Sequence, residues 1–320
     1  MSTAPEFTDS NNSPSQPGAC LACRSSGPFH PRSAAEPFRL LECAQCGSVF
    51  LFPQPSDAEM APFYSETYYG KGRKKFFSAA EAGVAALTRL KWRQLRPLLR
   101  PSGPLLDIGC GRGTLLQLAR ASGIDAYGIE RPSPLEHPVP NVFYKDLAEC
   151  SFPDQQFQLV VLWHVLEHLH HPAQTLREIH RILKPGGWLS LAVPNYGGAQ
   201  AQASGPHWFH LDPPRHLWHY RRPTLQALLG NSGFQPVRWG TFSFEYDWFG
   251  TLQSWMNRAL QDDNHLYGLL KSERVPPVAE GARMVATATL LALPALLSAL
   301  WDAARGQGGT LTVTAQKLAP

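Results

Sequence analysis

An acidic residue followed by three alternating glycines occupies residues 107–113, which read DIGCGRG. An apolar run precedes Asp107, and a helical pattern of apolar residues begins directly after Gly113. This stretch therefore predicts a buried strand, a tight turn and a helix N-terminus. Glycines let the backbone turn sharply and approach a ligand closely. The N–H groups of the first helical turn have no partners within the helix and would face that ligand.

The charge at this turn favours a cationic ligand over a dinucleotide. Dinucleotide-binding turns usually read Gly-x-Gly-x-x-Gly and place a pyrophosphate at the helix N-terminus. Here Gly109, Gly111 and Gly113 follow a Gly-x-Gly-x-Gly spacing, and Asp107 stands at the strand tip. A carboxylate repels pyrophosphate and attracts a cation. S-adenosylmethionine, which carries a sulfonium and an α-ammonium, fits this charge; an NAD-dependent oxidoreductase is the alternative.

Four further positions are expected to face the same site because they follow predicted strands, and ligands of open α/β sheets bind beyond the carboxyl ends of the strands. Glu130 is placed to accept hydrogen bonds from both ribose hydroxyls, and Asp146 is a candidate for the adenine amino group. For both acids an exposed loop position is the alternative. His164 and Val165 are expected to border cofactor and acceptor.

Four of the six cysteines form two short elbows. Cys20 and Cys23 make the first Cys-x-x-Cys pair, and after nineteen intervening residues Cys43 and Cys46 make the second. This spacing is typical of a zinc ribbon in which four thiolates hold one tetrahedral ion. Disulfides are the alternative, and the absence of any secretion signal disfavours them. A closed four-thiolate site has no open coordination position, so we expect a structural role for the metal.

Strand and helix patterns alternate from residue 105 onward, which predicts an α/β fold: a Rossmann-like seven-stranded sheet with flanking helices, preceded by a small zinc ribbon. Four prolines between residues 130 and 142 predict a loop in place of the second crossover helix. The expected organisation is a disordered tail (1–19), a zinc module (20–55), a helical lead-in (56–100), a catalytic core (101–242), a helical lid or insertion (243–308) and a final strand with its tail (309–320).

Several motifs together resemble the class I S-adenosylmethionine-dependent methyltransferases. They read DIGCGRG at 107–113, GIE at 128–130, HVLEH at 164–168, LKPGG at 183–187 and VPN at 193–195. The four-cysteine module ahead of them resembles that of bacterial sugar and natural-product methyltransferases. The resemblance implies that Asp107, Gly109, Gly111, Gly113 and Glu130 bind the cofactor.

Methyl transfer is an in-line displacement at a carbon that the sulfonium already activates, so the protein mainly aligns the reactants and excludes water. A base is needed only when the acceptor must lose a proton, as a hydroxyl does. His164 and His216 are the best candidates for base or acceptor positioning; a structural hydrogen-bonding role is the alternative for each. His168, four residues after His164, suggests a metal site, but no second ligand set is apparent, so we expect no catalytic metal.

The acceptor is expected to be a small molecule, a sugar or a lipid-linked compound. The insertions at 194–222 and 243–308 are rich in aromatic residues, which stack on sugars and planar rings; core packing is their alternative role. These aromatic residues are Trp208, Phe209, Trp218, Tyr220, Phe244, Tyr246, Trp248, Phe249 and Trp255. A non-catalytic zinc-ribbon interaction protein remains the alternative to an enzyme.

Charge and hydropathy limit the partners. The net charge of +4 is too small to indicate nucleic-acid binding, and the basic residues around Lys91 are expected to form a solvated helix face. Residues 1–19 contain no apolar signal segment, so we expect a cytoplasmic protein. No charge lies between Arg283 and Asp302. This apolar segment, interrupted by Pro294, is expected to be a buried or lid helix, with an interfacial helix at the inner membrane, or less readily a span, as the alternatives.

Overall fold

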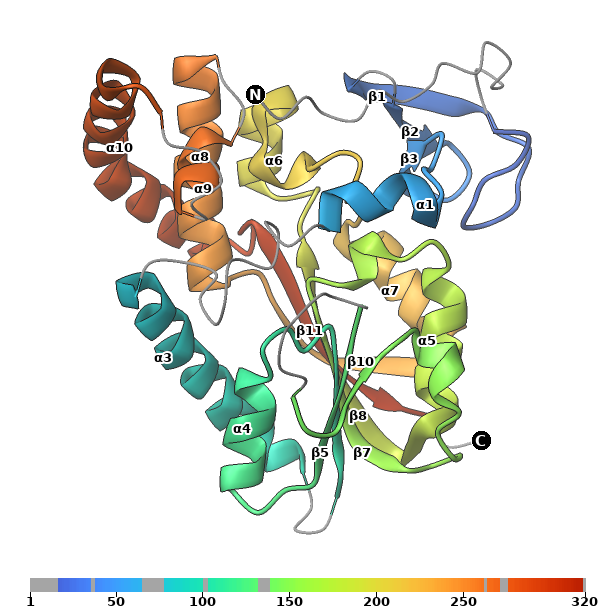
Figure 1. The fold of residues 1–320 in the computed structure, drawn as a ribbon. Coiled ribbons are helices and arrows are strands. Elements are labelled where there is room, and N and C mark those ends of the chain that lie inside the picture. The colour runs from blue at the N-terminus through green and yellow to red at the C-terminus, as the bar shows by residue number, and fades with distance from the viewer. Residues whose placement is uncertain are drawn as a thin grey trace.

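A central β-sheet divides the molecule, with α3 and α4 on one face and α5 and α7 on the other (Figure 1). The computed structural model describes residues 17–35, 38–64, 78–99, 103–131, 139–261, 264–270 and 276–318. Most of the tail predicted at 1–19 and all of residues 132–138, in the proline-rich crossover, lie outside these residues. The four helices that cover the sheet are α3 (Ser78–Leu95), α4 (Thr114–Ala121), α5 (Pro172–Ile182) and α7 (Arg222–Asn231).

The sheet has seven strands in the order β10-β11-β8-β7-β4-β5-β6, which confirms the predicted Rossmann-like architecture. The five strands from β8 to β6 are mutually parallel, while β11 is antiparallel to both of its neighbours. Their bounds are β4 (Leu105–Ile108), β5 (Ala126–Glu130), β6 (Val142–Tyr144), β7 (Phe157–Trp163), β8 (Leu183–Pro194), β10 (Phe234–Gly240) and β11 (Thr310–Lys317).

Strand β8 begins earlier than the sequence predicts. The Pro-Gly-Gly stretch at 185–187 was expected to separate the preceding helix from a strand at 188–193. Instead, Leu183 already pairs with Phe157 of β7, and the pairing shifts register before Trp188 meets Leu159. The Pro-Gly-Gly stretch is thus an irregularity inside the strand, which its glycines accommodate.

The four cysteines lie beside a second, small antiparallel sheet with the order β1-β2-β3-β9, which confirms the predicted N-terminal module. Its strands are β1 (Phe29–Ala35), β2 (Phe38–Cys43), β3 (Val49–Phe52) and β9 (Trp218–His219). The last strand follows β8 of the large sheet in the chain, so the larger domain completes the small sheet. Within the small sheet the ring of Phe50 packs against those of Phe29 and Trp218. Buried residues of both sheets belong to one hydrophobic core.

A helical unit lies above the carboxyl ends of the strands, beside the small sheet (Figure 1). It contains α6 (Ala199–Ser204), α8 (Phe244–Leu260), α9 (His265–Leu270) and α10 (Val278–Ala304), and α8 packs between α6 and α10. The remaining short elements are α1 (Asp57–Met60) and the 3-10 turns η1 (Ala61–Tyr64), η2 (Arg96–Leu98), η3 (Leu147–Cys150), η4 (Leu166–His168), η5 (Gly205–His207) and η6 (Phe209–Leu211).

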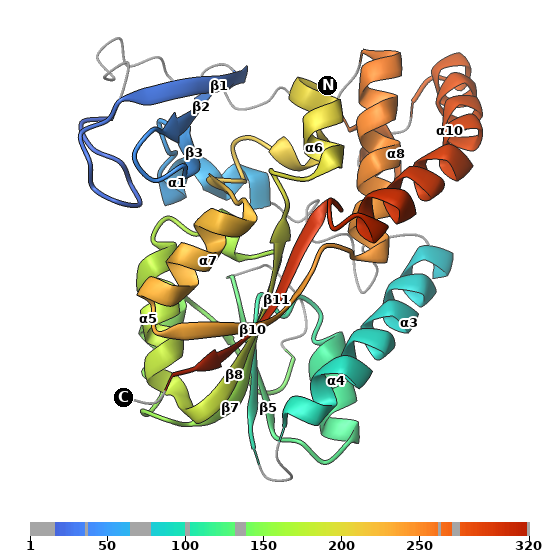
Figure 2. The same cartoon turned by 180° about the vertical axis from the view of Figure 1, so that it is seen from behind.

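Helix α10 differs from its prediction in two ways. Pro294 does not end it: the helix continues to Ala304 and bends along its length (Figure 2), because a proline removes one backbone hydrogen bond without preventing the turns on either side. It is also exposed rather than buried, with only 17% of its most apolar 18-residue window buried. Among the described residues it is the one helix long and apolar enough to cross a membrane.

Candidate active site

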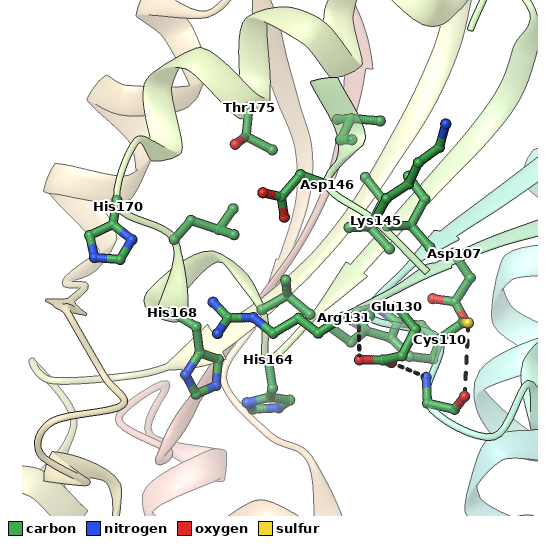
Figure 3. A pocket seen from close by; sticks show the side chains of 18 of the residues that line it. Asp107, Cys110, Glu130, Arg131, Lys145, Asp146, His164, His168, His170 and Thr175 are labelled. Atoms are coloured by element: carbon green, nitrogen blue, oxygen red, sulfur yellow. Dashed lines mark hydrogen bonds between the residues drawn. The ribbon is translucent and has the colours of Figure 1, made fainter. Parts of the chain in front are cut away.

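A cavity of about 1540 Å³ opens at the carboxyl ends of β4, β5 and β7, where a doubly wound sheet binds its ligands. Figure 3 shows side chains from several strand ends converging on it. Most of the predicted site residues line it: Asp107, Gly109, Gly111, Glu130, Asp146, His164 and Val165. Gly113 and His216 are not part of its lining. The structure thus brings together residues that are separated by almost sixty positions in the chain.

The turn after β4 depends on a glycine at position 109. Gly109 has φ +75°, and a Cβ added there would lie 2.3 Å from Cγ2 of Val165. The backbone of this turn therefore passes directly against the loop after β7. The amide of Gly111 donates a hydrogen bond of 2.6 Å to Oε2 of Glu130, so the carboxylate at the end of β5 holds the turn in place.

Substitution of this glycine should be costly for two separable reasons. We expect Gly109→Ala to lower the free energy of unfolding by about 2–4 kcal/mol, because it adds a steric clash to the strain of a left-handed alanine. Gly111→Ala is the matched control: its φ is also positive, at +52°, but an added Cβ meets nothing within 4 Å. It should cost only about 1–2 kcal/mol. Urea unfolding of both variants measures the difference, and equal losses would contradict the packing of Val165 on the turn.

Asp107 lies at the bottom of the cavity with 6% of its surface exposed. Burial, reinforced by the nearby Glu130 carboxylate, raises the pKa of Asp107 to about 8. Two carboxyl groups confined in one pocket favour a cationic ligand, because a cation would restore the charged form of Asp107. This is the electrostatic preference that the sequence predicts.

Glu130 and Asp146 contact the cavity in different ways. Oε1 of Glu130 also accepts a hydrogen bond from the amide of Arg131 at 3.0 Å, so both carboxylate oxygens are oriented by backbone N–H groups. Asp146 begins the 3-10 turn η3, where it and Glu149 cap each other's backbone amides. The position of Asp146 in the cavity wall agrees with the prediction, while its carboxylate already has a local structural role.

His164 follows β7 in a left-handed conformation, with φ 54°. Its ring stacks on that of Tyr246 from α8, with the ring centroids 3.6 Å apart. Burial, together with the positive charge of Lys91, lowers the pKa of His164 to about 3, so the imidazole is neutral at physiological pH. Its Nδ1 lies 3.5 Å from Oε1 of Glu167. Among the described residues, neither His164 nitrogen and neither Glu167 carboxylate oxygen has a hydrogen-bond partner.

Glu167 is almost completely buried, and burial raises its pKa to about 7. His168 and His216 also lie beside it, so that one ligand atom from each of the three residues falls within 4.8 Å of the others. Nδ1 of His168 lies 2.9 Å from the carbonyl oxygen of Arg215, and Nδ1 of His216 lies 2.8 Å from that of His210. Both Nδ1 atoms therefore donate to backbone carbonyls, and Nε2 of His216 lies 3.7 Å from Oδ2 of Asp212.

This cluster changes the interpretation of His216. The sequence places it among the candidates for the base, but it lies behind His168 instead of lining the cavity. His216 also lies beside Glu167 and His168. The spacing of the HVLEH motif at 164–168 could not reveal this neighbour, because it comes from a distant part of the chain. We therefore retain His164 as the candidate base and treat His216 as a residue that supports the cavity wall.

Several cavity residues were not anticipated. Lys91 of α3, expected on a solvated face, lines the cavity, forms an ion pair with Glu245 of α8 and places its Nζ 5.2 Å from the ring centroid of Trp163. Tyr64 stacks beneath the guanidinium of Arg131 at 4.3 Å. Conversely, Tyr246 is the only one of the nine predicted aromatic residues that lines this cavity in the described structure. Trp208, Trp218 and Tyr220 are buried in the protein interior.

The four cysteines have the geometry of a metal site. Their ligand atoms all lie within 4.8 Å of one another, and the Sγ–Sγ distances are 3.7 Å for Cys20 and Cys46 and 3.8 Å for Cys23 and Cys43. A tetrahedral zinc ion with bonds of about 2.3 Å separates its sulfur ligands by about 3.8 Å. A disulfide requires about 2.05 Å. The donor set and its spacing therefore fit zinc, and none of the four cysteines is in a disulfide.

Comparisons with known proteins identify the same central region. Residues 82–238 match the family model described as a methyltransferase domain. Ubiquinone biosynthesis O-methyltransferase of Albidiferax ferrireducens is 31% identical over 120 residues, which are 33% of this chain and 47% of that protein. The 27-O-demethylrifamycin SV methyltransferase of Amycolatopsis mediterranei is 36% identical over 139 residues, which are 37% of this chain and 50% of that protein.

The chain thus spans about half the length of the curated relatives that it matches. Among solved structures, this chain is similar to a SAM-dependent methyltransferase from Archaeoglobus fulgidus, with 21% sequence identity and a TM-score of 0.45. The alignment covers 72% of this chain and 94% of the other chain. The family match includes both the glycine turn and the loop after β7.

Proposed function

Because residues 82–238 form a class I S-adenosylmethionine-dependent methyltransferase domain, we propose that the protein methylates a hydroxyl group of a small-molecule acceptor. The observation that carries the proposal is the pair of buried carboxylates, Asp107 and Glu130, beside the glycine turn in a large cavity. Two matching relatives bear names of O-methyltransferases of small molecules, which supports oxygen as the acceptor atom.

The cavity residues suggest how the donor would bind. Asp107 attracts the positively charged methionine part of the donor, and Glu130, already oriented by two backbone amides, accepts the ribose hydroxyls. Val165 packs against the turn, and Asp146 borders the adenine end. The remaining cavity wall, formed by Trp163, His164 and Tyr246, is then available to the acceptor.

His164 is proposed as the general base, with ionised Glu167 beside its Nδ1 offsetting the burial that lowers its pKa in the unliganded protein. As methyl leaves sulfur for the acceptor oxygen, the hydroxyl proton passes to Nε2 of His164, and the sulfonium charge is replaced by an imidazolium charge. Nδ1 of that imidazolium would face Glu167, whose ionised form stabilises it. Glu167 is thus a positioning residue that acts through His164.

Zinc is proposed to be held by Cys20, Cys23, Cys43 and Cys46 in a structural role. All four coordination positions are filled by thiolates, so the metal would fix the small sheet and would not contact the acceptor. The small sheet shares its core with the catalytic domain through Trp218, so the metal stabilises the wall behind His168 indirectly.

Donor binding tests the proposal directly. Calorimetry is expected to show binding of S-adenosylmethionine and S-adenosylhomocysteine but not of NAD. Asp107→Asn and Glu130→Ala should each weaken binding of the donor by about 1–3 kcal/mol, or about 5–150-fold, the scale of a charged hydrogen bond. Asp125→Asn is a matched control, because this exposed acid precedes β5 at the opposite edge of the sheet. Binding of NAD, or unchanged donor affinity in both variants, would contradict the proposal.

Donor binding should also release a proton near neutral pH. Asp107 has a pKa of about 8 in the unliganded protein and is mostly protonated at pH 7. The cationic donor favours the carboxylate, so affinity should rise with pH until about pH 8 and then level off. Calorimetry at pH 7 in buffers of different ionisation enthalpy counts the protons released. We expect up to one in the wild type and none from this position in Asp107→Asn.

A further inference from the structure

Helix α10 presents its large apolar side chains to solvent. Seven of the large hydrophobic residues exposed in the described structure belong to it, and Leu290 is 75% and Trp301 63% exposed. The others are Val278, Val285, Leu293, Leu297 and Leu300. A surface helix of a soluble domain normally turns such residues toward the core and polar residues toward water. In α10 this arrangement is reversed.

The inner face of α10 already has a complete set of partners. Met284 and Ala295 are buried against Leu252 and Met256 of α8, and the indole of Trp248 donates a hydrogen bond of 2.9 Å to the carbonyl oxygen of Ala292. Small side chains therefore attach the helix to the protein. The leucines of the outer face are not needed for that attachment, which indicates that they have another partner.

The topology of the sheet excludes a membrane-spanning arrangement of α10. Strand β11 starts at Thr310, six residues after the helix ends, and pairs with β8 on one side and β10 on the other. The N-terminal half of the helix packs on α8, which is part of the same domain. Both ends are thus held on one side, and α10 forms the outer edge of the molecule in both views (Figures 1 and 2).

The charges around the apolar face suit an anionic surface. Exposed Arg283 lies between Val278 and Val285 near the start of the helix, and exposed Arg305 follows the helix with its guanidinium 5.4 Å from the ring centroid of Trp301. Asp302 is buried and pairs with Arg305 at 2.9 Å, so these two charges largely offset each other, and Glu280 lies 3.4 Å from His265. The positive charge of this face therefore comes mainly from Arg283. An apolar face with arginine at both ends and tryptophan at its border is typical of helices that lie in a membrane interface.

We propose that α10 docks the protein on an anionic bilayer surface, with its axis along the membrane plane. A second part of this inference rests on the proposed function. With α10 on the membrane, the acceptor is an amphiphile, such as a lipid-linked sugar or a prenylated ring, that reaches the cavity from the membrane interface. Helix α8 connects the two sites, because Tyr246 lines the cavity while Trp248 holds α10.

Vesicle sedimentation with the full chain tests the docking. Wild-type protein should sediment with vesicles of phosphatidylcholine and phosphatidylglycerol, and more weakly with phosphatidylcholine alone. A triple variant, Leu290→Gln, Leu293→Gln and Leu297→Gln, should reduce partitioning at least about tenfold, because it removes apolar surface from the outer face while retaining good helix formers. Arg283→Glu should weaken binding to the anionic vesicles only.

Three measurements make the result decisive. Val237→Gln changes a valine of similar exposure on β10, away from α10, and should sediment like wild type. The triple variant should retain its thermal unfolding midpoint and bind S-adenosylhomocysteine as wild type does, which separates docking from donor binding. If wild type fails to sediment, or forms a dimer in solution that the triple variant abolishes, the face serves a second copy and the proposal is wrong. Docking without any donor binding would instead contradict the proposed function.

Discussion

His164→Gln is expected to lower kcat by about 10²–10⁴-fold, the usual contribution of a positioned general base. The effect should appear at saturating donor and with little change in donor affinity, because the proposed arrangement places the side chain on the acceptor side of the cavity. His30→Gln, an exposed histidine in the small sheet, is the control and should retain full activity. A loss smaller than about tenfold would show that the acceptor needs no base.

The partner of His164 should leave a signature in the pH profile. Burial raises the pKa of Glu167 to about 7, so this side chain is protonated below neutrality and ionised above it. If ionised Glu167 stabilises the imidazolium of His164, kcat should rise as the pH increases through about 7 and then reach a plateau. Glu167→Gln should lower the plateau and abolish this rise. A profile that keeps the rise in Glu167→Gln would assign it to another group.

Loss of the zinc ligands should produce the largest effect on stability. A structural four-thiolate site contributes about 10–16 kcal/mol of binding free energy in small zinc modules, and much of that becomes folding free energy. Cys43→Ser is therefore expected to release the metal and unfold the small sheet. Since β9 pairs with β3 and the Trp218 indole donates to the carbonyl of Leu169, the damage should spread to the loop after β7.

Elemental analysis and hydrogen exchange would measure both parts of this prediction. The wild type should carry one tightly bound zinc per chain after gentle purification, and Cys43→Ser none. Amide protection should be lost in residues 38–52 and reduced near Trp218, while β4 and β5 remain protected. Cys150→Ser is a suitable control, because this cysteine lies at the end of η3, outside the four-cysteine cluster. Zinc-free wild type with an intact small sheet would contradict the structural role.

Much of the donor side of the site follows from local sequence alone. The turn at 107–113 combines a strand, left-handed glycines and a helix start within a few residues, and local geometry dictates how these are arranged. Glu130 and Val165 were predicted to lie near this turn because parallel strands end at one edge of the sheet, and both line the cavity. The two cysteine elbows are equally local, since each is a tight turn with a set spacing.

Contacts between distant segments were not accessible in the same way. His216 is forty-eight residues from His168 in the chain, yet the two rings are 4.7 Å apart. Lys91 belongs to a helix ahead of the sheet, and its pairing with Glu245 depends on how α3 and α8 meet. Strand β9 has only two residues, too few to show a period, and exists because β3 offers a free edge.

The sequence by itself determined the α/β class, the acidic residues of the glycine turn and the four-cysteine cluster, because short-range geometry and residue chemistry suffice for each. Only the tertiary structure decided which histidine faces the cavity and which lies behind it. It also decided the exposure of α10, because hydropathy cannot distinguish a buried helix from an exposed one. The packing of α10 on α8 and the return of β11 to the sheet leave the leucines of α10 on the surface.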